Sequence, residues 1–366
     1  MSERKIRVGI VGANTRYGWG GRAHVPAFSG LPEYEVLAIC TAHQDTAEEA
    51  AHQIGAPLAF DDYSEMVANP DIDLVSVAVR VPEHSSIVKA ALRAGKHVFC
   101  EWPLGVNLSE AQEMESLAQI QGVRTMVGLQ GRGSPAVLRL KELIEEGFVG
   151  DVLTCNMTMF QSGSTLRSSR AAWTADRDNG VNVLSVYVGH TIDALCFCLG
   201  EFEQVSSQIN TQVQELTLLD TQGTIRVTAP DNILVSGLLK SGAVASVHVA
   251  SVPWHGSGWR MEIYGREGTL VAESSQMVQL ADIRLLGAKG ANQSLEELDI
   301  PPRLTWIPET VPVGASFNVA QILRLLANGI REGQDVEPNF TTAVLRHNLL
   351  DVLERSSETR RRQQAP

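Results

Sequence analysis

The sequence contains no run of about 20 apolar residues, the length that a membrane-spanning helix needs. Its first residues, Met-Ser-Glu-Arg-Lys, lead directly into an apolar strand pattern without the apolar core of a signal peptide. These two absences argue against a membrane protein and against an exported one. We therefore expect a cytoplasmic protein with no membrane partner.

Cysteine is scarce and scattered. The five cysteines are an odd number and most of their neighbours are apolar, which is typical of thiols in a reducing compartment. Only Cys196 and Cys198 lie close together, and neither a second cysteine pair nor a histidine cluster accompanies them. We interpret them as small buried side chains and expect no metal site.

Positive charge is also in short supply, with 30 Lys and Arg against 42 Asp and Glu and a net charge of −12. Binding to nucleic acid needs a basic face that replaces counterions, so this balance argues against a nucleic-acid partner. The basic run Arg360-Arg361-Arg362 stands at the tail and is interpreted as a frayed, solvated terminus.

The chain is nevertheless rich enough in apolar residues to fold, at 44% hydrophobic and 20% charged. Its 366 residues are too many for one ordinary core, which predicts two domains. In the first third, β-branched runs alternate with helical stretches of about ten residues, the pattern of a parallel sheet with right-handed crossovers. The expected strands are 6–11, 35–41, 74–79 and 97–100, and the expected helices are 22–29, 46–54, 85–94 and 109–121.

After about residue 128 the pattern changes. A helix over 135–146 and a strand over 152–160 are followed later by strands over 232–240, 243–250, 260–264 and 269–273. Short turns such as Ser241-Gly242 separate several of these strands, which predicts an antiparallel sheet. Helices over 316–329 and 341–356 complete the chain, so this part is expected to be α+β.

A glycine-rich loop follows the first strand. Gly12 holds the first position of a dinucleotide-binding fingerprint, but Asn14 stands where the second glycine is expected, and Gly18, Gly20 and Gly21 come late. Between a strand and a helix, such a loop receives a pyrophosphate on its backbone N–H groups. The alternative is a flexible turn without a ligand. The prediction is an α/β Rossmann domain over 1–128 that binds NAD or NADP, followed by the α+β domain over 129–366.

The end of the second expected strand bears on the choice between NAD and NADP. Residues Thr41 to His43 include no acidic side chain of the kind that binds the ribose 2′-hydroxyl of NAD. Without that carboxylate a 2′-phosphate is not repelled, and Arg16 or His43 could lie near it. Thr15 and Thr41 complete this set of candidate cofactor residues, and the cofactor preference stays open.

Several later segments resemble a known family in order and spacing. They are Val81-Pro82-Glu83-His84, residues 94–104 with Glu101-Trp102-Pro103, residues 128–132, residues 143–150, and Gly189-His190 with Asp193. Together they resemble the Gfo/Idh/MocA oxidoreductase family over nearly the whole chain. The resemblance implies a Rossmann domain followed by a domain whose large, open, mainly antiparallel sheet builds dimers or tetramers. It also implies NAD(P)-dependent oxidation or reduction of sugars and related polyols.

The resemblance also assigns residues by position. The residues expected to line the cofactor are Gly12, Asn14, Pro82, His84, Glu101 and Gln130, and His190 is expected to face the substrate. We expect a sugar-like small-molecule substrate and a homo-oligomer, with a dimer as the simplest case.

Two positions depart from the family pattern. The family's Glu-Lys-Pro is Glu101-Trp102-Pro103 here, so the catalytic lysine is missing, and the aspartate usual four residues before the histidine is Val186. The longer glycine loop and the Glu-Trp pair resemble the branch that contains the galactose-pathway repressor of yeasts, which binds dinucleotide and acts on a protein partner. Two hypotheses follow: an NAD(P)-dependent oxidoreductase, or a dinucleotide-binding regulatory protein without turnover.

Hydride transfer at a carbinol carbon needs an acid–base group for the hydroxyl proton. The indole of Trp102 cannot serve, since it only donates a hydrogen bond, and instead offers an apolar wall to cofactor and substrate. His190 can serve, because an imidazole titrates near neutral pH, and Tyr187 lies one helical turn before it. The alternative for His190 is a core histidine satisfied by hydrogen bonds.

Four further residues are candidate substrate ligands, each with a structural alternative. Arg132 could bind a polyhydroxylated substrate or form a salt bridge. Trp173 and Trp254 could stack on a sugar ring or belong to the core. Asn182 could hydrogen-bond the substrate or satisfy a loop.

Overall fold

The protein is described by a computed structural model that covers residues 4–280, 282–291 and 294–366. The chain divides into two compact units. The first contains residues 1–133 and 305–344, and the second contains residues 134–304 and 345–366. The predicted boundary at residues 128/129 lies close to the first crossing, but the return of residues 305–344 to the first unit has no counterpart in the sequence prediction.

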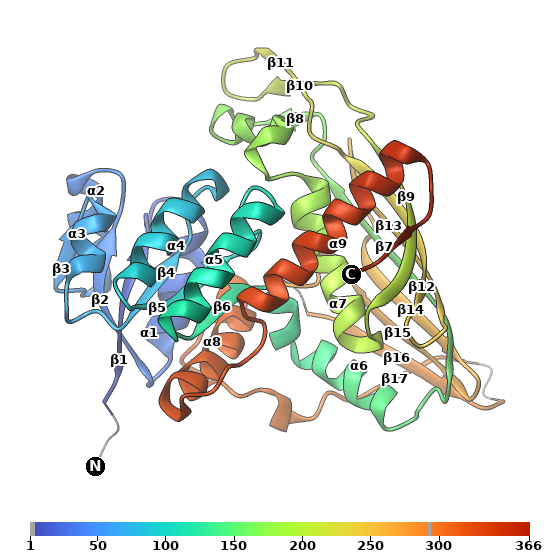
Figure 1. Ribbon diagram of the computed structural model, residues 1–366. Helices are drawn as coiled ribbons and strands as arrows, with labels where there is room; N and C mark the ends of the chain where they lie inside the picture. The colour runs from blue at the N-terminus through green and yellow to red at the C-terminus, as the bar shows by residue number, and fades with distance from the viewer. Residues whose placement is uncertain (1–3, 281, 292–293) are drawn as a thin grey trace. The chain divides into compact units, whose positions relative to one another are not determined.

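The first unit is built on a six-stranded parallel sheet with the order β3-β2-β1-β4-β5-β6 (Figure 1). Its strands are β1 (Ile6–Val11), β2 (Tyr34–Cys40), β3 (Leu58–Phe60), β4 (Leu74–Val77), β5 (His97–Glu101) and β6 (Thr125–Gly128). The central strands are buried on both faces, with every residue of β4 and β6 buried, which explains their continuous apolar, β-branched sequences. The predicted α/β class is confirmed.

Helices connect these strands, and a late helix joins them. They are α1 (Val25–Gly30), α2 (Gln44–Ile54), α3 (Tyr63–Ala68), α4 (His84–Arg93), α5 (Leu108–Gln121) and α8 (Ala315–Glu332). The apolar side of α8 belongs to the core of this unit, with Ile322 and Leu323 fully buried. Tyr34 on β2 donates a hydrogen bond of 2.7 Å to the Leu323 carbonyl. This burial explains why the chain returns to the first unit.

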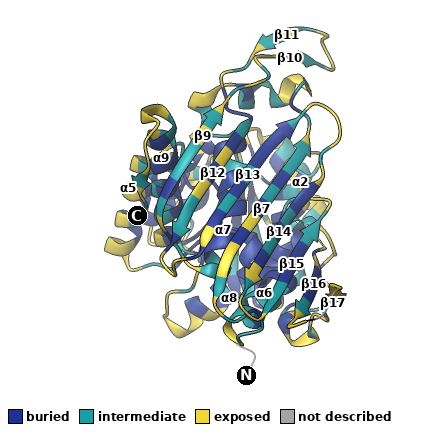
Figure 2. Ribbon diagram, turned by 90° about the vertical axis from the view of Figure 1, so that its right-hand side faces the viewer, coloured by how far each residue is buried: buried dark blue, intermediate teal, exposed yellow. Residues whose placement is uncertain are grey.

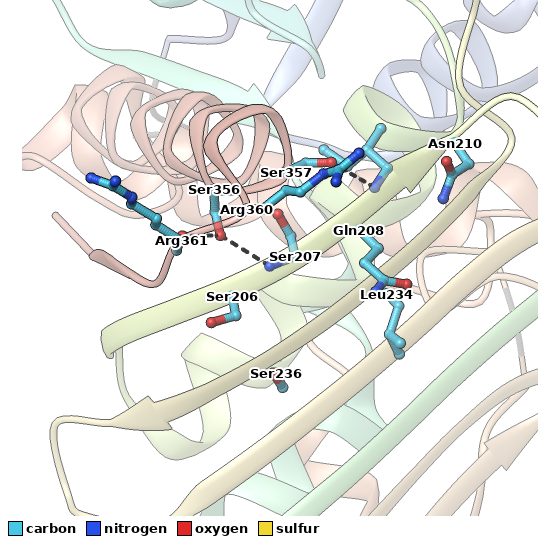
Figure 3. A pocket seen from close by; sticks show the side chains of 11 residues that line it. Ser206, Ser207, Gln208, Asn210, Leu234, Ser236, Ser356, Ser357, Arg360 and Arg361 are labelled. Carbon is cyan, nitrogen blue, oxygen red and sulfur yellow. Dashed lines mark hydrogen bonds between the residues drawn. The ribbon is translucent and has the colours of Figure 1, made fainter.

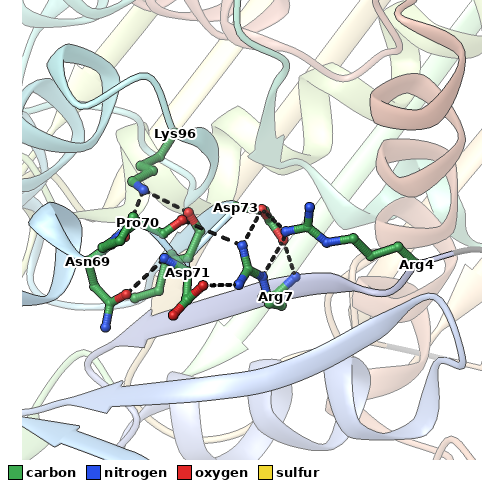
Figure 4. Close-up of polar contacts among 8 residues, drawn as sticks. Arg4, Arg7, Asn69, Pro70, Asp71, Asp73 and Lys96 are labelled. Atoms are coloured by element: carbon green, nitrogen blue, oxygen red, sulfur yellow. Dashed lines mark hydrogen bonds and ion pairs between the residues drawn. The ribbon is translucent and has the colours of Figure 1, made fainter.

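A charged cluster ties down the amino-terminal ends of β1 and β4 (Figure 4). The Asp73 carboxylate accepts from the Arg7 backbone N–H at 2.9 Å and from Arg7 Nε at 3.1 Å. Burial alone raises the pKa of Asp73, but the hydrogen bonds from Arg7 outweigh it and hold that pKa below its ordinary value. Lys96 donates to the carbonyls of Asn69 and Ile72 at 2.8 Å each. The cluster stabilises the end of the sheet opposite the glycine loop.

The second unit is built on a nine-stranded sheet with the order β17-β16-β15-β14-β7-β13-β12-β9-β18 (Figure 2). Its strands are β7 (Val152–Ser162), β9 (Phe202–Asn210), β12 (Asn232–Leu239), β13 (Val244–Val252), β14 (Gly258–Gly265), β15 (Gly268–Ser274), β16 (Arg284–Lys289), β17 (Glu296–Glu297) and β18 (Gln363–Gln364). The β13–β7 pair is parallel and the others are antiparallel. The prediction of a large, mainly antiparallel sheet is confirmed.

The two faces of this sheet differ. Met157, Val247 and Ile263 point to the buried side, where α6 (Pro135–Glu145) and α7 (Gly189–Leu199) lie behind the strands of Figure 2. The other face carries polar side chains that bond across strands. Ser246 donates to Asn156 at 2.7 Å, and Asn156 donates in turn to the Glu262 carboxylate at 3.0 Å. This face therefore presents polar groups over several neighbouring strands.

Two parts of the second unit were not predicted. A small sheet joins β8 (Leu166–Arg167), β10 (Glu215–Leu218) and β11 (Thr224–Arg226). The tail after α9 (Phe340–Thr359) turns back as β18 and pairs with β9. Arg360, Arg361 and Arg362 are exposed, as expected of a solvated run. The expectation that the terminus is frayed was wrong, because the residues that follow pair with β9, whose backbone groups need a partner.

Candidate functional site

The carboxyl edge of the parallel sheet collects most of the predicted cofactor residues. Gly12 follows β1, Thr41 follows β2, Glu101 ends β5 and Gln130 follows β6. Strand order reverses between β1 and β4, and ligands of doubly wound sheets bind outside the carboxyl ends at such a switch point. These four positions therefore share the edge that a dinucleotide would occupy.

The glycine loop is folded tightly back on the strand ends. Gly12 has φ +92°, and a Cβ atom there would lie 2.4 Å from the Ala78 carbonyl oxygen. A Cβ on Gly20 or Gly21 would lie 2.5 Å from the Gly12 oxygen or 2.3 Å from the Asn14 oxygen. The protein's own backbone thus requires these glycines, and the fold itself depends on Gly12.

Polar side chains shape the two sides of this loop. Asn14 Oδ1 accepts from the Arg16 backbone N–H at 3.0 Å, and the Arg16 guanidinium forms an exposed ion pair with Glu49 on α2. Thr41 donates to the His43 carbonyl at 3.0 Å. Thr15 is half-buried in the same loop. Residues 41–43 carry no acid, and Glu49 on α2 is a carboxylate that the ion pair with Arg16 holds beside the loop.

Pro82 and His84 lie in the segment after β4. Pro82 is exposed, whereas His84 is buried and its two ring nitrogens lie 3.0 Å from the Pro103 oxygen and 3.2 Å from the Val79 oxygen. Burial lowers the pKa of His84. His84 therefore links the chain after β4 to the chain after β5.

Glu101 lies at the centre of a buried hydrogen-bond network. Gln130 Nε2 lies 2.9 Å from both carboxylate oxygens, and His24 Nε2 lies 2.7 Å from Oε1. The other ring nitrogen of His24 lies 2.7 Å from the Ser76 hydroxyl. The sequence motifs point to Glu101 and Gln130 but not to His24. In the sequence, His24 could have been noticed only because it lies three residues after the Gly20-Gly21 pair and just before a mainly apolar helical stretch.

These residues fit a bound dinucleotide. Gln130 Oε1 is buried and accepts no hydrogen bond from any described residue, and buried acceptors without a donor are uncommon in folded proteins. The amide and hydroxyl groups of a nicotinamide nucleoside are donors of the kind that this oxygen lacks. The glycine loop, Asn14 and Thr15 would hold the pyrophosphate, and Glu101 and Gln130 would hold the nicotinamide side.

The remaining candidates of the first unit are buried. Trp102 is 5% exposed and precedes Pro103 through a cis peptide bond. Arg132 is also buried, and its guanidinium lies 2.7 Å from the Glu337 carboxylate. Arg132 therefore forms a salt bridge, the alternative to a substrate contact that its residue type left open. A contact to substrate in addition stays a prediction.

In the second unit, His190 is buried on the first turn of α7, and Tyr187 lies on the π-helix that runs into it. Burial raises the pKa of Tyr187. Asn182 starts that π-helix, where it accepts from Ser185 N–H at 3.1 Å, so it satisfies the loop. Asp193, one turn after His190, lies 3.7 Å from the buried guanidinium of Arg346, which also pairs with Glu201.

The two tryptophan candidates of this unit differ in exposure. Trp173 is half-buried in a short helix over 169–175, whereas Trp254 is 78% exposed in the loop between β13 and β14. Trp254 therefore has no core role and is available to a ligand or a partner.

An open pocket of about 690 Å³ lies elsewhere, along β9 and the end of α9 (Figure 3). None of the predicted site residues lines it. The Ser356 hydroxyl accepts from Ser207 N–H at 3.1 Å, and the Ser357 hydroxyl accepts from Ile209 N–H at 3.0 Å. These serines satisfy the edge of β9 next to its pairing with β18, which is a structural task.

Across the residues that the structure describes, no three histidine, cysteine or acidic side chains gather as a metal site. In the same part of the chain no helix is both long and apolar enough to cross a membrane.

Comparison with known proteins places the chain among its relatives. The model of the GFO_IDH_MocA oxidoreductase family, described as an NAD-binding Rossmann fold, matches residues 6–129, and the model of the Gal80p C-terminal domain matches residues 135–274. Levoglucosan dehydrogenase of Pseudarthrobacter phenanthrenivorans is 30% identical, over 73% of this chain and 73% of its own length. The chain belongs to the Gfo/Idh/MocA family.

Other Gfo/Idh/MocA relatives include both enzymes and regulators. The dehydrogenase aclE of Aspergillus oryzae is 29% identical over 98% of each chain. The galactose/lactose regulatory protein GAL80 of Kluyveromyces lactis is 32% identical over 66% of this chain, but over only 57% of its own length. A structure of levoglucosan dehydrogenase with NADH and L-sorbose superposes with a TM-score of 0.85 at 25% identity and covers 99% of both chains. A structure of Gal80p from Saccharomyces cerevisiae shares the fold, with a TM-score of 0.86.

Proposed function

We propose that this Gfo/Idh/MocA protein is an NAD(P)-dependent oxidoreductase that acts on a sugar-like or cyclic polyol substrate. The observation that carries the proposal is the buried Gln130 side chain at the carboxyl edge of the parallel sheet: its Nε2 donates to Glu101, while its Oε1 accepts from no described residue. In a closed core such an acceptor without a donor is destabilising. It suits the donor groups of a nicotinamide nucleoside.

The substrate class comes from the relatives. Levoglucosan dehydrogenase structures superpose on 99% of this chain and have been solved with NADH and either L-sorbose or levoglucosan. Both ligands are polyhydroxylated rings or their close relatives, and a carbinol carbon in such a compound is the group that a nicotinamide cofactor oxidises. From their side-chain chemistry we also propose that Trp102, Arg132, Trp173, Asn182 and Trp254 contact the substrate.

When bound, the nicotinamide supplies or accepts the hydride. The chain's own task is to move the hydroxyl proton, for which we assign His190 as the acid–base group in place of the missing lysine. Tyr187 keeps its proton at neutral pH because burial raises its pKa, so it would donate a hydrogen bond to the substrate rather than act as a base. Asp193 and Arg346 would hold the α7 turn that carries His190.

A second function has a specific observation in its favour. The Gal80p C-terminal model matches residues 135–274, and Trp102 replaces the residue that supplies acid–base chemistry in most of the family. A dinucleotide-binding regulator without turnover would keep the Glu101 network and need no proton carrier.

One experiment separates the two functions. The purified protein is analysed for copurifying dinucleotide and titrated with NAD, NADH, NADP and NADPH, and absorbance in the reduced-nicotinamide band is then followed as L-sorbose, levoglucosan and other polyols are added. A substrate-dependent change supports the enzyme. Dinucleotide binding with a silent screen and a protein recovered by pull-down supports the regulator. Absence of any dinucleotide binding contradicts both.

A further inference from the structure

The further inference concerns His24, a residue that the family pattern did not single out. Its side chain is fully buried, and both ring nitrogens are engaged, one with Ser76 on β4 and one with Glu101 at the end of β5. The ring lies 4.8 Å from the Phe99 ring, centroid to centroid, and meets Phe28 edge-on at 6.5 Å. Packing and hydrogen bonds therefore hold this imidazole in one orientation.

The carboxylate partner determines the role of Nε2. An ionised carboxylate only accepts, so His24 Nε2 donates to Glu101 Oε1. In a neutral ring Nδ1 is then the acceptor, and the Ser76 hydroxyl donates to it. Hydrogen bonds thus connect Ser76, His24 and Glu101 in one chain.

The two carboxylate oxygens of Glu101 accept different numbers of hydrogen bonds. Oε1 accepts from both His24 and Gln130, whereas among the described residues Oε2 accepts from Gln130 alone. A carboxylate oxygen can accept two hydrogen bonds, so Oε2 keeps a place for a donor from a ligand. A Cβ added to Gly128 would lie 2.6 Å from that same Oε2, so the glycine leaves the oxygen uncrowded.

The unusual glycine loop explains how His24 reaches this position. Residues 20–24 form a π-helix. This kind of helix is rare in proteins overall, but where it occurs it is often at a functional site. Gly20 and Gly21 allow it to pack directly on the carbonyls of Gly12 and Asn14. The lengthened loop thus delivers a histidine to a carboxylate 77 residues further along the chain.

We propose that His24 is a positioning residue for dinucleotide binding: it orients the Glu101 carboxylate so that Oε2 faces the cofactor as an acceptor. The inference rests on the proposed dinucleotide site. It requires no turnover, so it holds for the enzyme and for the regulator alike.

The test is a double-mutant cycle on dinucleotide affinity, measured by calorimetry with NADH and NADPH. His24→Leu should weaken binding by about 10- to 100-fold, since a hydrogen bond to a charged group is lost. His24→Gln keeps an N–H donor and should recover part of this loss. In a Glu101→Gln background, His24→Leu should change affinity by less than about twofold, because the carboxylate that His24 orients is no longer present.

Two controls separate positioning from folding. Ser76→Ala removes the other partner of His24 and leaves the Glu101 contact, so binding should stay within about threefold of wild type. Gly128→Ala leaves His24 intact but crowds Oε2, and should weaken binding. Should His24→Leu fail to fold, the cycle is run with His24→Gln. Urea unfolding of each variant, followed in parallel, is expected not to track the affinities.

Three outcomes would overturn the inference. Wild-type affinity in His24→Leu would show that Glu101 needs no support. An equal loss in the Glu101→Gln background would show that His24 acts on the fold alone. A wild-type protein that binds neither dinucleotide would remove the proposed function first, and this inference with it.

Discussion

At the scale of single residues, the proposed oxidoreductase needs a group that carries the substrate proton, since Trp102 stands where most of the family has lysine. We proposed His190, on the first turn of α7, for this role. We expect His190→Ala to lower turnover by about 10²- to 10⁴-fold, the usual effect of losing a general acid–base group, with dinucleotide affinity unchanged.

The matched control is His248→Ala, which removes a histidine of the outer sheet face that contacts Asn232 at 3.0 Å. Turnover should be unaffected there, and steady-state kinetics on both variants provide the measurement. Full activity of His190→Ala would contradict the catalytic assignment while leaving the oxidoreductase proposal standing.

Trp102 also contributes to the stability of the fold. Its side chain is 5% exposed, so it acts as a core residue as well as a proposed wall of the site. We expect Trp102→Ala to reduce the free energy of unfolding by about 3–5 kcal/mol, as large-to-small core substitutions do. Trp254→Ala, at 78% exposure, should change it by less than about 0.5 kcal/mol. Urea unfolding curves compare the two, and equal effects would contradict the burial argument.

The site shows what a sequence can predict at this scale. Glu101, Gln130 and Gly12 stand in motifs of fixed spacing, so the amino-acid sequence alone is enough to point to them. His24 has no such motif, because its partners Ser76 and Glu101 lie 52 and 77 residues away and meet it only through the fold. A Cβ on Gly12 would meet the Ala78 carbonyl, so a valine there would strain the fold as well as the proposed ligand site.

At the scale of secondary-structure elements, β1, β2, β4 and β5 were predictable because buried parallel strands have continuous apolar sequences. β3 is only three residues long and β18 only two, too short for any periodicity to appear. The pairing of β18 with β9 depends on an edge that exists only in the folded sheet. The parallel pairing of β13 with β7 could not be predicted from the sequence either, because the two strands lie far apart in the chain and no short turn connects them.

Arg346 connects two elements of the second unit through buried charges. Its side chain is 1% exposed and pairs with Asp193 on α7 and with Glu201 just beyond that helix. We expect Arg346→Leu to lower the free energy of unfolding by about 3–5 kcal/mol, since it removes the buried guanidinium that pairs with the buried Asp193 carboxylate and the half-buried Glu201. Lys141→Ala breaks the exposed pair with Glu145 and should cost less than about 1 kcal/mol. Comparable losses in the two variants would contradict the role given to burial.

At the scale of the whole molecule, the outer face of the nine-stranded sheet makes self-association a natural expectation. It presents polar groups together with exposed apolar ones such as Leu234 on β12, which is 41% exposed. We propose a homodimer through this face, so light scattering should give twice the chain mass of 39.7 kDa. Leu234→Arg should shift the protein toward monomer, while Leu219→Arg, also exposed but outside the large sheet, should not. A wild-type monomer at micromolar concentration would contradict the proposal.

The pH dependence of stability follows from histidines that folding keeps neutral. Burial lowers the pKa of His84 and of His97, and it lowers the pKa of His347 to about 4. An exposed histidine in the unfolded chain has a pKa of about 6.5. Above that pH neither state binds the proton and stability is fully present. Below it the unfolded state is protonated first, so the free energy of unfolding falls as pH falls, until the folded histidines titrate in turn.

His347 makes this effect measurable. With folded and unfolded pKa values of about 4 and about 6.5, its contribution at pH 5 is a loss of about 2 kcal/mol relative to neutral pH. His347→Leu should remove that part of the slope, so urea midpoints of the variant should fall less between pH 7 and pH 5 than those of wild type. Asp73 provides the contrast: its lowered pKa stabilises the fold above about pH 4 and is lost only as pH falls through the folded value. Asp73→Asn should therefore leave the slope between pH 7 and pH 5 unchanged, and an identical slope in His347→Leu and wild type would show that His347 is not kept neutral by burial.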